Sequence, residues 1–186
     1  MARKPKTYVA LLRGINVGGK NVIPMADLRQ CLEEAGASDV TTYIQSGNVL
    51  FRSSIGSNKK LVAALEKALS KSFSYNARVV IVEKNDYIAM VGSAHNGWGT
   101  RKEQKHNAMF LVDESDAREF LLTLPQPKKT VDTVSTGSHV IFWSVKSSQI
   151  AQSTMTKIAR MPEYKLMTVR NHKTTCKLVE LLENYV

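Results

Sequence analysis

The hydrophobic and polar positions in the first half of the chain switch between the spacing of strands and the spacing of helices. Short apolar runs rich in β-branched residues predict strands, and apolar residues three or four apart predict helices. The predicted strands are Thr7–Leu12, Val40–Ile44, Val49–Phe51 and Ala77–Val82. The predicted helices are Pro24–Ala35 and a segment after Ser57 with the apolar face Leu61, Val62, Leu65, Leu69 and Phe73. The resulting βαββαβ order is that of a ferredoxin-like sheet.

The second half repeats this order of elements more loosely, without repeating the residues themselves. Its predicted elements are a helix at Asp86–Val91, a basic loop at His95–His106, a strand at Met109–Val112, a helix at Asp116–Leu124, a hairpin of Val131–Val134 and Val140–Val145, a helix at Gln149–Arg160, a strand at Leu166–Val169 and a helix at Thr174–Tyr185. We therefore predict an α+β protein. A ferredoxin-like βαββαβ subdomain at 1–83 is followed by a second, related α/β subdomain with extra helices at 84–186.

The segment between the first strand and the first helix concentrates the candidate ligand-binding residues. Its basic, glycine and amide residues are Arg13, Gly14, Asn16, Gly18, Gly19, Lys20 and Asn21. A strand, a glycine-rich loop and a helix start often form an anion site together, because backbone N–H groups can approach the ligand closely. The spacing matches neither the P-loop nor the dinucleotide fingerprint. The segment therefore predicts an anion-binding site but does not identify the anion as a nucleotide.

The turn between the second and third strands should lie beside this loop. In a βαββαβ sheet the first two strands run the same way and the third lies next to the first, so the loop and the turn share one sheet edge. The turn contributes Ser46, Gly47 and Asn48 as further candidate residues. Each residue also has a structural alternative, because glycine serves positive φ and asparagine satisfies backbone groups in turns. We predict that the loop and the turn form two halves of one pocket.

A third polar cluster precedes the last predicted helix and adds Arg170 and Asn171 to the candidate ligand-binding residues. Asn171 or Thr174 alternatively serves as the helix N-cap. A charge at an exposed helix end contributes only about 0.3–1 kcal/mol. A ligand site here therefore needs the glycine-rich loop as well.

Charge and cysteine usage narrow the class of partner. The 26 Lys and Arg residues against 16 Asp and Glu residues give a net charge of +10 and an isoelectric point near 9.7. Such an excess fits a phosphate-containing ligand or nucleic acid, and it equally fits a solvated basic surface. Cys31 and Cys176 lie near apolar positions and read as buried free thiols in a reducing, cytoplasmic compartment. No apolar run approaches the roughly 20 residues of a membrane span, so we expect no membrane partner.

No complete catalytic set is visible in the sequence. His95, His106, His139 and His172 have no ligand-like spacing, so we expect no metal site and no cofactor. The three polar clusters contain no carboxylate that could act as a general base. Three hypotheses stay open: a binder of a phosphate-bearing ligand, which we favour, an enzyme acting on a phosphorylated small molecule, and a scaffold or protein-interaction module. The pattern does not predict the oligomeric state.

Three segments carry a resemblance to a known family. They are LLRGINVGGKN at 11–21, TYIQSGNVLF at 42–51 and TVRNHKT at 168–174. Over nearly its full length the sequence resembles a bacterial family known as domain of unknown function 1697. The resemblance implies two related ferredoxin-like subdomains and no established activity. Where the family usually has Trp-Asn-Thr after the Arg-Asn pair, this chain has His172, Lys173 and Thr174, so an imidazole replaces a stacking indole.

Overall fold

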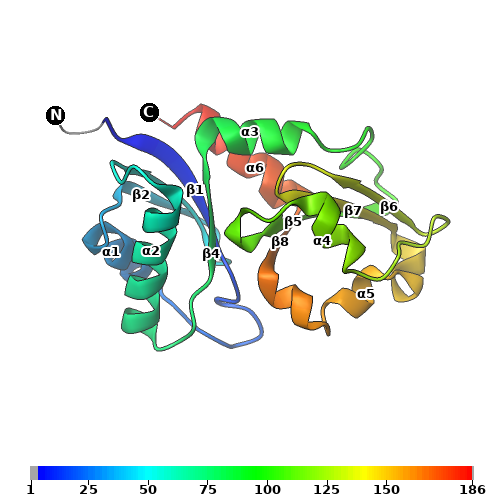
Figure 1. The fold of residues 1–186 in the computed structure, drawn as a ribbon, viewed down its shortest axis with the longest axis horizontal. Helices are drawn as coiled ribbons and strands as arrows, with labels where there is room; N and C mark the ends of the chain where they lie inside the picture. Colours follow the sequence, from blue (N-terminus) through cyan, green and yellow to red (C-terminus); the bar gives the residue numbers. More distant parts are fainter. Residues whose placement is uncertain (1–3, 186) are drawn as a thin grey trace. The chain divides into compact units, whose positions relative to one another are not determined.

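Two compact units make up the fold, and each contains its own four-stranded sheet (Figure 1). The computed structural model describes residues 4–185. One unit comprises Met1–Tyr87 together with Leu182–Val186, and the other comprises Ile88–Leu181. The last residues of the chain therefore belong to the first unit, whereas the expected subdomains at 1–83 and 84–186 divide the chain only once.

The first unit has the strand order β2-β3-β1-β4, and all of its neighbouring strands pair in antiparallel fashion. Its elements are β1 (Lys6–Leu12), α1 (Met25–Glu34), β2 (Ser38–Tyr43), β3 (Asn48–Ser53), α2 (Asn58–Phe73), β4 (Val79–Glu83) and the start of α3 (Lys84–Gly92). Because β1 and β2 are each antiparallel to β3, they run parallel to each other. The predicted ferredoxin-like βαββαβ order is therefore confirmed.

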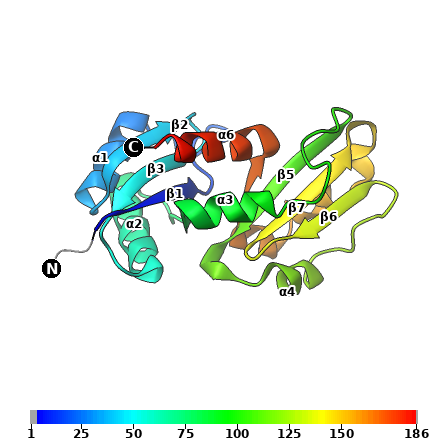
Figure 2. The same ribbon diagram turned by 90° about the horizontal axis from the view of Figure 1, so that it is seen from above.

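Helices α1 and α2 pack against each other and against the first sheet (Figures 1 and 2). The apolar residues that recur every three or four positions on both helices join residues of β1, β3 and β4 in one buried core. Ser57 is the N-cap of α2, because its hydroxyl accepts a hydrogen bond from the N–H of Lys60. Pro24 is the N-cap of α1 rather than its first helical residue.

The second unit repeats the architecture with the strand order β6-β7-β5-β8, again fully antiparallel (Figure 1). Its strands are β5 (Gln104–Leu111), β6 (Asp132–Thr136), β7 (Val140–Lys146) and β8 (Met167–Asn171). Its helices are the rest of α3, α4 (Ala117–Leu122), α5 (Met155–Ile158) and α6 (His172–Glu183), with short 3-10 turns at Val112–Glu114, Ser147–Gln152 and Pro162–Leu166. The last two residues of α6 belong to the first unit. The prediction of a second, related α/β unit is confirmed.

One predicted helix is wrong. The sequence predicts a continuous helix over Gln149–Arg160, but a 3-10 turn ends at Gln152 and a single helical turn follows at Met155–Ile158. The break lies at Ser153 and Thr154, whose hydroxyl groups donate to the carboxylate of Asp132. Serine and threonine side chains compete with helix formation when they find such a partner.

The buried carboxylate of Asp132 holds this part of the second unit together. It accepts hydrogen bonds from Trp143 Nε1 at 3.0 Å, from Thr154 Oγ1 at 2.9 Å and from the backbone N–H of Lys128 at 3.0 Å, in addition to the hydroxyl of Ser153. Burial alone would raise the pKa of Asp132, but the hydrogen bonds outweigh it and lower that pKa. The charged carboxylate therefore joins β6, β7 and the break before α5.

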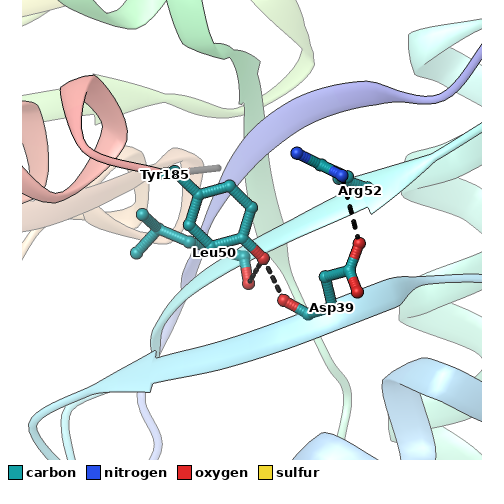
Figure 3. Close-up of polar contacts among 4 residues, drawn as sticks. All are labelled: Asp39, Leu50, Arg52 and Tyr185. Atoms are coloured by element: carbon teal, nitrogen blue, oxygen red, sulfur yellow. Dashed lines mark hydrogen bonds and ion pairs between the residues drawn. The ribbon is translucent and has the colours of Figure 1, made fainter.

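Tyr185 packs on the first unit where β2 is irregular (Figure 3). The register of β2 against β3 shifts around Asp39, whose φ is +54°. The Tyr185 hydroxyl donates to the backbone carbonyl of Asp39 and lies 3.4 Å from that of Leu50. Arg52 lies 5.9 Å from the centre of the Tyr185 ring and pairs with the Asp39 carboxylate at 3.5 Å. Burial raises the pKa of Tyr185, so its hydroxyl stays a proton donor at neutral pH.

Candidate functional site

The glycine-rich segment after β1 folds into a small hairpin. A bridge joins Val17 to Lys20, and the N–H of Lys20 donates to the carbonyl of Val17 at 3.2 Å. Gly18 and Gly19 between them have φ values of +59° and +72°. Two successive positive φ angles are those of a type I′ turn, which glycine adopts most readily. The two glycines therefore have the structural role given as the alternative in the sequence analysis, because they form the turn.

The side chain of Asn16 ties this hairpin to the turn between β2 and β3. Its Nδ2 donates to the carbonyl of Ile23 at 3.0 Å and to that of Gln45 at 2.8 Å. Its Oδ1 accepts from the N–H of Ile23 at 2.7 Å. We call this group of hydrogen bonds the Asn16 junction. It confirms that the loop and the turn are neighbours, although they are almost thirty residues apart in sequence.

Gly47 brings the same two segments together through the backbone. Its carbonyl accepts a hydrogen bond from the N–H of Leu12 at 2.7 Å. A Cβ at Gly47 would lie 2.8 Å from the Cβ of Leu12 and 3.0 Å from the side chain of Ile15, and φ is +77°. Only glycine fits here without displacing the strand end.

Three of the amide side chains predicted to line the site are engaged within the fold. Besides Asn16, the buried Asn48 donates to the carbonyl of Tyr43 and to the hydroxyl of Ser46, each at 3.1 Å. Asn21 Nδ2 donates to the carbonyl of Gly14 at 2.8 Å. These amides hold the loop and the turn in shape, and any ligand contact must come from groups beyond them.

The tip of the hairpin is open. A Cβ added at Gly14, Gly18 or Gly19 would meet no atom within 4 Å. Among residues 4–185, no backbone hydrogen bond uses the N–H of Gly18 or Gly19. Lys20 follows directly and is exposed, whereas Arg13 is half-buried at the end of β1 and its own N–H donates to the carbonyl of Arg78. Gly14 and Asn21 are exposed as well, but the Asn21 amide and the Gly14 carbonyl bond each other, so Gly18, Gly19 and Lys20 are the exposed residues at the tip of the hairpin.

Arg170 and Asn171 lie in the second unit, at the end of β8. Arg170 is buried and donates to the hydroxyl of Thr168 at 2.8 Å and to the carbonyl of Val169 at 2.9 Å. Asn171 Oδ1 accepts from the N–H of Thr174 at 2.9 Å, so Asn171 is the N-cap of α6. Of the two predicted N-cap alternatives, Asn171 is confirmed.

A histidine cluster in the second unit was not predicted from the sequence. His95 Nε2 lies 3.1 Å from the hydroxyl of the buried Ser144, and that hydroxyl lies 2.7 Å from His106 Nδ1. The other nitrogen of His106 lies 3.0 Å from the carbonyl of Arg101, and the other nitrogen of His95 lies 3.0 Å from the hydroxyl of Ser135. One continuous chain of hydrogen bonds therefore links β5, β6, β7 and the loop before β5.

The carbonyl at one end of this chain determines the tautomer of both imidazoles. A carbonyl only accepts, so His106 Nε2 carries a proton and the Nδ1 of neutral His106 accepts from Ser144. The single hydroxyl proton of Ser144 is then used, so His95 Nε2 must donate to Ser144. The Nδ1 of neutral His95 in turn accepts from Ser135. The neutral cluster thus satisfies all of these nitrogens with one set of proton positions.

Trp98, Phe142, His172 and Cys176 complete the cluster. Trp98 packs edge-on against His172, with ring centres 4.8 Å apart, and against Phe142 at 5.0 Å. A Cβ at Gly99 would fall on the His172 ring, so glycine is needed there. His172 Nε2 lies 3.3 Å from the sulfur of Cys176, one helical turn along α6. Burial raises the pKa of the Cys176 thiol, which disfavours the reactive thiolate.

The cluster predicts that stability falls in mild acid. Burial lowers the pKa of His95, and the charges of His106 and Arg101 lower it further; burial and His106 likewise lower the pKa of His172. Because the folded pKa lies below the ordinary value of 6.5, the neutral forms stabilise the fold above pH 6.5, and this contribution is lost as pH falls through the folded pKa. Thermal unfolding between about pH 8 and about pH 5 measures the effect. His95→Gln should flatten the decline, and His139→Gln, outside the cluster, should leave it unchanged.

Residues 4–185 present neither a cluster of metal-ligating side chains nor a helix suited to cross a membrane. No group of three or more His, Cys, Asp or Glu side chains in that range is placed to hold a metal ion. The described helices include none that combines the length and the apolar character of a membrane span. Cys31 and Cys176 are both free thiols.

Comparison with known proteins gives a family and a structural relative. The model of a family described as "Protein of unknown function (DUF1697)" matches residues 6–142. The structure of the conserved bacterial protein SP0830 from Streptococcus pneumoniae is similar, with a TM-score of 0.84 and 29% sequence identity over 96% of this chain and 99% of that chain. No curated protein matches the chain.

Proposed function

Because the chain belongs to the DUF1697 family of proteins of unknown function, its function must be argued from its own residues, and we propose that the hairpin between Arg13 and Asn21 binds a phosphate-bearing ligand, either a nucleotide or RNA. The observation that carries the proposal is the open tip at Gly18 and Gly19, whose N–H groups lie beside the exposed Lys20. Unused backbone N–H groups next to a cation are a common way to bind phosphate.

The charge around the hairpin supports an anionic ligand. The first carboxylate of the chain is Asp27, so no acidic side chain precedes α1. The turn at 44–48 also contains no acidic residue. The excess of +10 over the whole chain adds long-range attraction for a polyanion such as RNA. Two free thiols fit a reducing compartment, and we place the protein in the cytoplasm as part of the same proposal.

Catalysis on a phosphorylated small molecule is the weaker alternative. Such a reaction needs a proton acceptor or donor near the hairpin. Asp116 and Asp132, whose pKa is lowered, both lie in the second unit. Neither the hairpin nor the turn at 44–48 contains an acidic residue, so binding accounts for the first unit better than catalysis.

Substitution of Lys20 tests the proposed function. The probe is a fluorescently labelled single-stranded RNA of about ten nucleotides, titrated at about 50 mM and about 200 mM salt. We expect Lys20→Gln to weaken binding about fivefold to tenfold at the lower salt and to reduce the salt dependence, because one phosphate contact is lost. The matched control is Lys71→Gln, which removes the same charge from an exposed position on α2. Equal losses in both variants, or no binding by the wild type, would contradict the proposal.

A further inference from the structure

Ile44 is in an unusual conformation at the end of β2. Its φ is +49°, in the left-handed region that a β-branched side chain rarely adopts, because the Cβ is crowded against the backbone. Its side chain is also 50% exposed. An asparagine or a glycine would suit this turn better on both grounds. Strained backbone of this kind persists preferentially at functional sites.

Two more exposed aliphatic side chains lie next to the same hydrogen bonds. Val17 is 62% exposed and Val22 is 73% exposed. Val17 follows Asn16, Val22 precedes Ile23 and Ile44 precedes Gln45, so each adjoins one residue of the Asn16 junction. We call Val17, Val22 and Ile44 the apolar tip. Among the described residues of the first unit, these three are its exposed large hydrophobic side chains.

Val17 lies on the same hairpin as Gly18, Gly19 and Lys20, and Val22 follows that hairpin directly. Ile44 lies in the turn after β2, which Asn16 joins to the hairpin through the carbonyl of Gln45. A ligand that satisfies both the apolar tip and the phosphate-binding groups must present an apolar surface beside a negative charge. A nucleotide with an unpaired base does so, since the faces of its base are apolar and its phosphate is one sugar away. Inorganic phosphate lacks the apolar surface, and a duplex hides the faces of its bases by stacking.

We infer that the ligand of this site is a nucleotide unit whose base is unpaired, with the base against the apolar tip and its phosphate at Gly18, Gly19 and Lys20. The inference rests on the proposed function and narrows its ligand. The inference rests on Ile44, which is both strained and exposed. The hydrogen bond from Asn16 to Gln45 holds the proposed phosphate-binding hairpin beside it. A free nucleotide and a residue of single-stranded RNA share this chemistry.

Ile44→Asn separates binding from folding, because asparagine tolerates the left-handed conformation. We expect the melting temperature of this variant to stay level or rise by about 2–4 °C, so loss of binding would not reflect misfolding. Its affinity for single-stranded RNA should fall about threefold to tenfold, because the contact between a base and an apolar side chain contributes to binding whatever the base. Its affinity for inorganic polyphosphate should not change. Leu122→Asn, at an exposed apolar position on α4, is the matched control and should bind RNA like the wild type.

The wild type is compared with four probes: a mononucleotide, single-stranded RNA, the corresponding duplex and inorganic polyphosphate. Preference for single-stranded over duplex RNA of about tenfold, lost in Ile44→Asn, supports the inference. If Ile44→Asn lowers the affinity for the mononucleotide more than the affinity for single-stranded RNA, the ligand is a free nucleotide. The inference is overturned if the wild type binds duplex and single-stranded RNA equally, or if Ile44→Asn binds single-stranded RNA like the wild type. In either case the proposed function stands if polyphosphate binding depends on Lys20. If none of the four probes binds, both the inference and the proposed function are overturned.

Discussion

Replacing Asp132 by alanine should lower the free energy of unfolding by about 3–5 kcal/mol, because it removes the acceptor of the buried Trp143 indole and of the buried Ser153 hydroxyl. The indole N–H of Trp143 is fully buried, and the hydroxyl groups of Ser153 and Thr154 are also buried. Each of these groups donates to the Asp132 carboxylate. Within residues 4–185 the acceptor of the Trp143 indole is the Asp132 carboxylate, so without it the desolvation of this N–H would be uncompensated.

Thermal or denaturant unfolding measures this change, and a loss of this size corresponds to a melting temperature about 10 °C lower. Asp132→Asn should fall between the wild type and Asp132→Ala, because the amide retains one acceptor oxygen. The control is Asp86→Ala, at an exposed position near the start of α3. A change below about 1 kcal/mol in Asp132→Ala, comparable to that of a surface substitution, would show that these hydrogen bonds do not hold the second unit together.

Gly47→Ala should destabilise the first unit by about 2–4 kcal/mol, since it combines backbone strain with overpacking. Its new Cβ would lie 2.8 Å from the Cβ of Leu12, where β1 ends against the turn. Gly18→Ala is the matched comparison: φ is also positive there, at +59° against +77° for Gly47, but the new Cβ would have no atom within 4 Å. We expect about 1–2 kcal/mol for this second variant, from strain alone.

The difference between these two glycine variants measures the close approach of the loop and the turn. Both replace hydrogen by methyl at a positive φ, so the strain contribution largely cancels. Denaturant unfolding of the two proteins under the same conditions gives the difference directly. If both variants lose the same stability, the turn does not pack against the end of β1 as tightly as described, and the basis for a composite site would be lost.

The neighbourhood of the loop and the turn could be predicted from the sequence because it depends on strand order alone. Once the order βαββαβ is recognised, the ends of β1 and β2 must meet at one sheet edge. The use of Asn16, Asn21 and Asn48 could not be predicted in the same way. Strand order determines which segments meet, but not which donor pairs with which carbonyl, and both ligand binding and turn formation require amide side chains.

The histidine cluster was missed because of where β5 begins. The sequence predicts a strand from Met109, where apolar residues become continuous, but β5 extends back to Gln104. His106 therefore lies on a strand opposite Ser144, rather than in a loop. The alternation at 104–108 is weak because His106 and Asn107 are polar, and only the pairing with β7 shows that His106 faces Ser144. His95 and His172 join through the loop before β5 and through α6, which no local pattern predicts.

The broken helix at 149–160 has a similar origin. Its local composition allows a helix, and its apolar spacing favours one. The partner that prevents it, Asp132, lies some twenty residues earlier on β6. Tertiary hydrogen bonds thus decide the structure where local propensity is modest. The return of Tyr185 to the irregular part of β2 is a tertiary contact of the same kind, made across most of the chain.

Most of the amide residues first assigned to the site shape the hairpin and the turn instead of facing a ligand. The asparagines hold the hairpin beside the turn, and Gly47 permits the close approach. The groups that remain to meet a ligand are the N–H groups at the tip, Lys20 and the apolar tip. A positively charged hairpin of this kind needs no catalytic carboxylate, because its proposed task is to hold phosphate.

The most direct test of the binding proposal follows the backbone amides themselves. Uniformly ¹⁵N-labelled protein is titrated with single-stranded RNA of about ten nucleotides at low salt, and amide chemical shifts are recorded. The account predicts that the largest shifts occur at Gly18, Gly19 and Lys20, while Gly92 at the end of α3 is unaffected. Binding with unshifted amides at the hairpin tip, or with the largest shifts in the second unit, would contradict it.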